Sequence, residues 1–200
     1  MPLRLLPFST RPLYAAIFWC AFALWILLEI IASRVKRSPD SSRARDRGSL
    51  LLIIVLWWTG IAADFSLSFL LPQASLSRGR GPVFLVGIAL MLAGIALRQY
   101  SMAVLGKFFT FDVAVDSGHA LVETGPYRYV RHPSYTGALL TLFGFGLALG
   151  NWAGLATALF CLAFAYTYRI RVEEAALSAA LGEPYKEYVG RTWRLVPFLF

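Results

Sequence analysis

The stretch LLLIIVLWWTGIAADFSLSFLL, residues 50–71, carries one charged side chain in 22 residues. A helix of this length spans about 33 Å, enough to cross a hydrocarbon core of about 30 Å. Further apolar runs occupy residues 13–32, 83–105, 134–149 and 152–168. The last two reach only about 24–26 Å as helices, and Gly150 and Asn151 alone separate them. We therefore predict an all-α integral membrane protein with about five transmembrane helices, the last two forming a tight helical hairpin.

The composition of the whole chain agrees with a membrane protein. Hydrophobic residues make up 58% and charged residues 15%, against about 25% charged in soluble domains. A chain of 200 residues suits one domain. We predict a single transmembrane domain over 1–200, with three N-terminal helices in 1–105 and a catalytic core in 106–200. Cys20 and Cys161 lie in apolar runs, so we expect free thiols rather than a disulfide or a metal site.

Basic residues set the expected orientation. The net charge is +8, and its placement between apolar runs favours anionic lipid headgroups over nucleic acid as partner. Segments 34–47, 98–131 and 169–200 hold fifteen of the nineteen lysines and arginines. By the positive-inside rule these segments and the C-terminus are cytoplasmic and the N-terminus is outside. Three lysines against sixteen arginines suggest a GC-rich genome, and in a bacterium the membrane would be the inner membrane.

The first apolar run and the polar residues within runs need separate interpretation. The first run is too long for a signal-peptide core, so we expect a retained helix. Asp64 is either a functional ionisable group or a helix-packing hydrogen-bond partner. Glu29, near a helix end, is expected to extend to the interface or pair with Arg34. Gly87 and Gly94 are seven residues apart, on nearly one helix face, which favours close helix packing.

The polar and aromatic stretch HALVETGPYRYVRHPSYTG, residues 119–137, leads into the fourth apolar run. Pro133 suits the first position of a helix. Free N–H groups at that helix start, with Arg131 and His132, would make a small anion site. Tyr135, three residues after His132, shares its side of the first turn. Alternatively, these residues only cap the helix and anchor it at the headgroups.

A second charged cluster, RIRVEE at residues 169–174, ends the fifth apolar run. Arg169 and Glu173 are four residues apart and share a helix face, whereas Glu174 is turned away by about 100°. Solvated charge pairs at a cytoplasmic helix end would be the simpler explanation. The short turn at Gly150, however, brings this cluster beside the start of the preceding helix. Convergence of acids, bases and tyrosines at one membrane edge indicates a functional site.

The pattern HxLVxxGxYxxxRHPxYxG, followed by RxxxEE, resembles the isoprenylcysteine carboxyl methyltransferase family. The ending LGEPYKEY, with Arg191, Arg194 and Pro197 after it, also resembles that family, so the likeness covers residues 107–197. It implies a membrane methyltransferase that uses S-adenosylmethionine at the cytoplasmic face without a Rossmann domain, and no GxGxxG is present here. The cofactor positions that it implies are His119, Ala120, Leu121, Val122, Tyr127, His132, Pro133, Ser134, Tyr135 and Glu173.

The same resemblance implies that Arg169 holds a substrate carboxylate, with Arg169 and Glu173 as the catalytic pair. Either Glu173 or Glu174 could hold the ammonium group of the cofactor. An ionised carboxylate acceptor needs no general base, and a water-poor site favours the merging of sulfonium and carboxylate charges. No metal is expected.

The substrate is expected to be lipid-like or prenylated and to enter from the membrane. The sequence leaves open an isoprenylcysteine, a free isoprenoid acid or a phospholipid amine as acceptor, and it does not define an oligomeric state. An NADPH-dependent sterol-type reductase shares RHPxYxG, but Glu173 with Glu174 and the short chain count against it. A non-enzymatic membrane protein is a further alternative, against which stand the filled motif positions.

Overall fold

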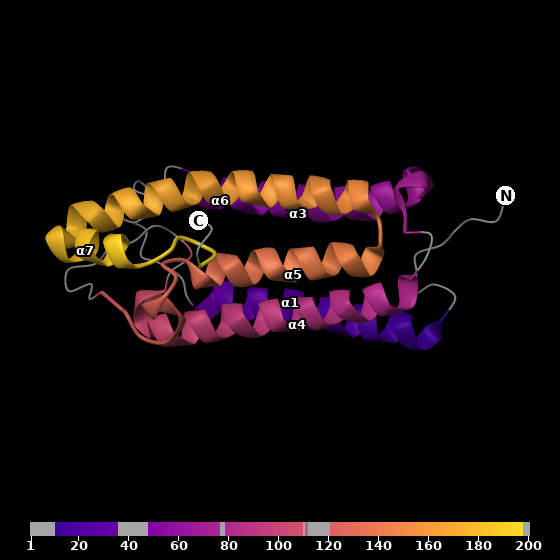
Figure 1. Cartoon of the computed structure of the whole chain (residues 1–200), viewed down its shortest axis with the longest axis horizontal. Coiled ribbons are helices and arrows are strands. Elements are labelled where there is room, and N and C mark those ends of the chain that lie inside the picture. The colour runs from indigo at the N-terminus through magenta and orange to yellow at the C-terminus, as the bar shows by residue number, and fades with distance from the viewer. Residues whose placement is uncertain (1–10, 36–47, 77–78, 110, 112–120, 198–200) are drawn as a thin grey trace.

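The computed structural model describes residues 11–35, 48–76, 79–109, 111 and 121–197 of the chain. The described part is a bundle of antiparallel helices with a short helix packed at one end (Figure 1). Its α-helices are α1 (Pro12–Val35), α3 (Ser49–Leu70), α4 (Arg80–Leu105), α5 (Pro133–Leu149), α6 (Trp152–Leu181) and α7 (Glu183–Arg191). Single 3-10 turns are η2 (Pro72–Ala74), η3 (Gly106–Phe108) and η4 (Gly125–Arg128).

The helical membrane architecture is confirmed, with two differences in the last helices. Four helices in the described residues, α1, α3, α4 and α6, are long and apolar enough to cross a membrane, whereas α5 has 17 residues and is shorter. The apolar run that ends at residue 168 is the first part of a longer helix, because α6 continues to Leu181. Arginine, glutamate, alanine and leucine all favour helix, so the charged cluster extends the helix until Gly182, at φ 61°.

Helices α4 and α5 pack at very short range, as the spacing of Gly87 and Gly94 predicted. A Cβ on Gly87 would lie 2.6 Å from the backbone nitrogen of Ala148 and 2.7 Å from the carbonyl oxygen of Gly144. The main partner of α6 is α3, so α5 and α6 each pack more on another helix than on each other. Figure 1 shows the α3–α6 pair on one side of α5 and the α1–α4 pair on the other.

Aromatic side chains attach α1 to the rest of the bundle. Phe18 and Trp25 are both buried, and their rings lie 5.6 Å and 6.0 Å from the ring of Phe145 on α5. Trp25 also meets Trp57 of α3 edge-to-face at 5.2 Å. Large rings bury much apolar surface while keeping the helix axes apart. The α1 interface is therefore an aromatic seam, in contrast to the glycine contact between α4 and α5.

Both predicted polar clusters lie at one end of the bundle, which we call the site end. The C-terminal end of α4, the start of α5, the extension of α6 and helix α7 meet there (Figure 1). The opposite end holds the α5–α6 turn, where the Asn151 side chain caps α6 by accepting a hydrogen bond from Gly154 N at 3.0 Å. The same amide donates to the Leu71 carbonyl of α3 at 2.9 Å. The turn is thereby fastened to α3.

Candidate functional site

The C-terminal segment around Trp193 and Arg194 forms backbone hydrogen bonds with the residues that lead into α5. Arg131 N donates to the Trp193 carbonyl at 2.7 Å, His132 N donates to the Arg194 carbonyl at 3.0 Å, and Trp193 N donates to the Tyr129 carbonyl at 3.0 Å. The N–H groups of Tyr135 and of the next residue both donate to the His132 carbonyl within the first turn. Tyr135 N, one of the N–H groups expected to be free at this helix start, therefore has a partner within the protein.

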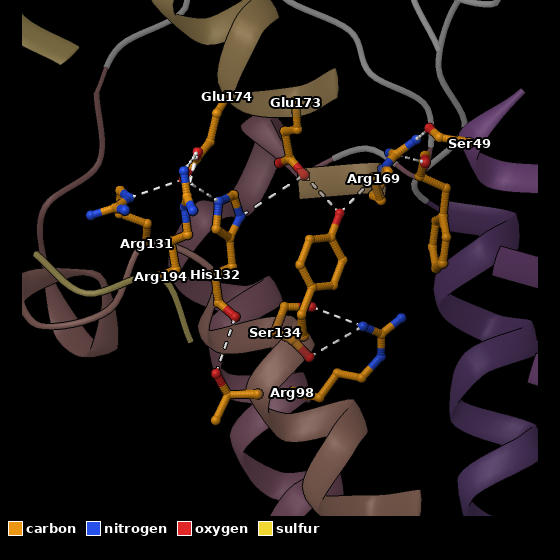
Figure 2. Close-up of polar contacts among 12 residues, drawn as sticks. Ser49, Arg98, Arg131, His132, Ser134, Arg169, Glu173, Glu174 and Arg194 are labelled. Atoms are coloured by element: carbon orange, nitrogen blue, oxygen red, sulfur yellow. Dashed lines mark hydrogen bonds and ion pairs between the residues drawn. The ribbon is translucent and has the colours of Figure 1, made fainter. Parts of the chain in front are cut away.

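Tyr135 links two residues of the site, Arg169 and Glu173 (Figure 2). Its ring stacks between that of His132, at 5.5 Å, and that of Tyr166, at 4.5 Å. Its hydroxyl donates a 2.7 Å hydrogen bond to Glu173 Oε2 and accepts one from Arg169 Nε at 3.2 Å. The predicted convergence of the two clusters, and the shared face of Arg169 and Glu173, are confirmed.

Glu173 and Glu174 have very different surroundings. Glu174 accepts from Arg131 Nε at 3.2 Å and from Arg194 at 3.0 Å, and it lies 3.4 Å from His132 Nε2. Its side chain is 14% exposed, against 30% for Glu173. Oε1 of Glu173 has no hydrogen-bond partner among the described residues. Glu174 thus occupies the basic pocket that the sequence predicted for an external anion, and Glu173 is the accessible acid.

Arg169 is buried and has a partner on each branch of its guanidinium group. Nη1 donates to Ser49 Oγ at 2.8 Å, Nη2 to the Phe111 carbonyl at 2.5 Å, and Nε to the Tyr135 hydroxyl. It is joined to Glu173 through the phenol of Tyr135 rather than by direct contact.

One interpretation of the sequence paired Glu29 with Arg34, but the structure gives Glu29 a different partner. Glu29 accepts two hydrogen bonds from Arg98 of α4, at 2.5 Å and 2.8 Å, and Arg98 Nη1 donates to Ser134 Oγ at 2.9 Å. Arg98, counted with the basic connecting segment in the sequence, is a buried residue within α4. The environment of Arg98 is therefore defined by its contacts within the bundle and not by the basic segment that follows it in the sequence.

The remaining predicted positions are spread around this core. Tyr127 is buried and donates to the Ser101 carbonyl of α4 at 3.3 Å. Burial raises the pKa of Tyr127, so its phenol stays protonated and anchors the segment. Leu121 and Val122 are partly buried, and Pro133 is buried at the first position of α5. His119 and Ala120 lie outside the described residues.

Several residues of the site were missed by sequence reasoning. They are Glu29, Ser49, Arg98 and Tyr166. Glu29 and Arg98 could have been found from the sequence, because opposite charges in two apolar runs near the same membrane face are costly unless they are paired. Ser49 and Tyr166 carry no such signal.

Comparisons with known proteins agree with this architecture. The family model described as "Phospholipid methyltransferase" matches residues 83–184. A protein-S-isoprenylcysteine O-methyltransferase of Schizosaccharomyces pombe is 36% identical over 105 residues, covering 50% of this chain and 44% of the relative. Its Saccharomyces cerevisiae counterpart is 34% identical over 116 residues, covering 57% and 48%. The chain spans about half the length of these curated relatives.

A solved structure resembles the fold. It is that of the eukaryotic intramembrane Ras methyltransferase ICMT (isoprenylcysteine carboxyl methyltransferase), with a TM-score of 0.61 and 23% sequence identity. The similarity covers 73% of this chain and 52% of that one. It therefore extends beyond the matched family segment to part of the N-terminal helices.

Proposed function

Since the chain belongs to the phospholipid methyltransferase family, we propose that it transfers a methyl group from S-adenosylmethionine to a lipid-like acceptor at the cytoplasmic membrane interface. The preferred acceptor is the carboxylate of an isoprenylcysteine or another isoprenoid-type acid. The observation that carries this proposal is the line Arg169–Tyr135–Glu173, in which one phenol joins a buried cation to an accessible acid. The names of the relatives support the same reaction.

The donor groups of the site fit the proposed cofactor. S-adenosylmethionine, when bound, supplies a methyl group on a sulfonium cation and also carries an ammonium group. Glu173, with one unpaired oxygen and partial exposure, suits a charge-assisted contact with such cations. Glu174 already contacts three basic side chains, so the role of cation ligand falls to Glu173. Its Tyr135 bond fixes the orientation of the carboxylate.

Arg169 is the proposed site of the acceptor carboxylate. Its acceptors include the Ser49 hydroxyl, the Phe111 carbonyl and the Tyr135 phenol. A carboxylate forms stronger hydrogen bonds to guanidinium than these neutral groups do, and it can displace one or two of them. An acceptor held on Arg169 and a donor held on Glu173 would then meet across Tyr135. Alignment of the two reactants would supply much of the rate.

The test uses protein purified in detergent and separates cofactor binding from acceptor binding. Calorimetry with S-adenosylhomocysteine is compared for wild type, Arg169→Ala and Arg169→Lys, and methyl transfer is followed with a farnesylated cysteine. We expect Arg169→Ala to keep cofactor affinity but lose turnover, and lysine to restore little, because an ammonium cannot form the bidentate contact. Absence of wild-type binding to S-adenosylhomocysteine, or binding of NADPH instead, would reject the proposed chemistry.

A second acceptor class is favoured by the description of the family model. A phospholipid amine must lose a proton before it can attack, so its methylation rate would rise with pH through the pKa of the amine. Phosphatidylethanolamine is therefore assayed beside the farnesylated cysteine between about pH 6 and 9. A rate that is confined to the amine and rises with pH would replace the carboxylate acceptor in this proposal.

A further inference from the structure

A buried ion pair between α1 and α4 reaches the site through the first turn of α5. Two branches of the Arg98 guanidinium bind the Glu29 carboxylate, at 2.5 Å and 2.8 Å, while Nη1 donates to Ser134 Oγ at 2.9 Å. We propose that Glu29 and Arg98 form a positioning pair that sets the first turn of α5 and, through it, the place of Tyr135 beside Glu173. Figure 2 shows Arg98 directed at Ser134.

The geometry couples Arg98 to the site by a short path. Ser134 lies between His132 and Tyr135 in the chain, and the His132 carbonyl accepts from Tyr135 N at 3.0 Å and from Thr136 N at 3.1 Å. Movement of Ser134 would therefore also move the stacked rings of its neighbours His132 and Tyr135. The Tyr135 bond to Glu173 is only 2.7 Å long, and hydrogen bonds of this kind weaken steeply when their angle changes.

Attachment of α1 alone does not explain the pair. Phe18 and Trp25 already hold that helix through the aromatic seam. The side chains of Arg98 and Glu29 are only 9% and 14% exposed, and a buried ion pair contributes little more stability than apolar residues of similar size. What a planar guanidinium adds is direction, because it fixes a carboxylate on one edge and another acceptor on the next.

The pair also gives α1 a part in the site. The family model begins at residue 83, so Arg98 and Ser134 fall inside it and Glu29 does not. Glu29 balances the charge of Arg98 and selects the orientation in which Nη1 faces Ser134. Of the two measurements that test this inference, only that of cofactor affinity rests on the proposed function; that of hydrogen exchange does not.

Two mild variants test the positioning role. Arg98→Lys keeps a cation beside Glu29 but has no second branch for Ser134, and Ser134→Ala removes the hydroxyl while leaving the ion pair intact. We expect both to increase amide hydrogen exchange in the first turn of α5 without ligand, and to weaken S-adenosylhomocysteine binding roughly tenfold, the value of one hydrogen bond. The double variant should be no worse than Arg98→Lys alone, because that change already removes the contacts of Arg98 Nη1 with the hydroxyl and the carbonyl of Ser134.

The matched control is Ser68→Ala. Ser68 is as buried as Ser134, at 5% exposed, and its hydroxyl bonds only to its own helix, at the Asp64 carbonyl, 2.7 Å away. It should leave exchange in α5 and cofactor affinity unchanged. Unchanged exchange in Arg98→Lys and Ser134→Ala, or additive losses in the double variant, would overturn the positioning role. If wild type binds no S-adenosylhomocysteine, the proposed function fails, while the exchange measurement still decides this inference.

Discussion

The two ends of the bundle surround their acidic side chains in different ways. At the site end, Glu29, Glu173 and Glu174 each accept a hydrogen bond from an arginine or a tyrosine. At the end with the α5–α6 turn, Asp64 is fully buried and neither carboxyl oxygen has a hydrogen-bond partner among the described residues. It packs instead against glycines of α5 and α6.

The two ends therefore differ in whether an acid has polar partners as well as in how deeply it is buried. An uncompensated buried charge is far more costly than a neutral acid, so Asp64 fits its place as a neutral packing group. A Cβ on Gly146 would lie 2.7 Å from Asp64 Oδ2, which shows how closely the carboxyl meets the helix backbone. Weak Cα–H···O contacts suit such an arrangement. Of the two roles open for Asp64, helix packing is the one that we prefer, without the expected hydrogen bond to its carboxyl.

The largest effect on folding is expected from Glu174→Ala at the site end. This change leaves Arg131, His132 and Arg194 without their shared acid. Removing one partner of a largely buried ion network costs about 3 kcal/mol. Thermal melting in detergent should show a clear fall for Glu174→Ala and a small one for Glu173→Ala, which serves as control. Equal falls would mean that the two acids are structurally equivalent.

Glu173→Ala should act on ligand binding instead. Loss of a charge-assisted contact costs about 1.5–3 kcal/mol, or roughly tenfold to a hundredfold in affinity. Calorimetry with S-adenosylhomocysteine measures this loss, and a folded but milder Glu174→Gln variant provides the comparison. A larger loss of affinity in Glu174→Gln than in Glu173→Ala would reverse the roles assigned to the two acids.

At the opposite end, Gly154→Ala should destabilise the fold by about 1–3 kcal/mol through overpacking. The added Cβ would clash with Asp64 Oδ1 and lie 2.9 Å from its Cα. Gly190→Ala in α7, where nothing lies within 4 Å, is the matched control and should be neutral or slightly stabilising. Equal melting temperatures for Gly154→Ala and Gly190→Ala would show that the helices leave more room at Asp64 than described.

The smallest effect is expected from Asp64→Asn, which keeps size and polarity. Its stability should change by less than about 1 kcal/mol, as for other nearly isosteric changes. Methyl transfer should also stay close to wild type, because Asp64 lies at the end away from Tyr135. Lost turnover with an unchanged melting temperature would instead make Asp64 a functional group.

Helix positions were predictable from the sequence because they depend on local properties. The apolar runs placed α1, α3, α4 and α5 within a few residues of their observed bounds. The rule of about 100° per residue also separated the faces of Glu173 and Glu174. The full length of α6 was not predicted, because the apolar pattern ends at residue 168 while the helix continues through the charged cluster to Leu181.

Partners across the bundle could not be predicted in the same way. Glu29 and Arg98 are 69 residues apart in the chain, and a sequence gives no angle between their helices. The sequence also predicted basic groups open to a ligand at the start of α5, whereas the fold supplies Glu174 to these side chains, and the carbonyls of Trp193 and Arg194 accept from the backbone N–H groups beside them.

The sequence by itself determined that apolar helices would form, that glycines would bring α4 close, and that two polar clusters would meet at one end. Apolar surface, helical period and chain length suffice for these, since each acts between near neighbours or through the short turn at Gly150. Only the tertiary structure decided which of two adjacent acids is open, which arginine supports α5, and that Asp64 has no polar partner. Those outcomes depend on packing between helices, where a shift of about 1 Å makes or breaks a hydrogen bond.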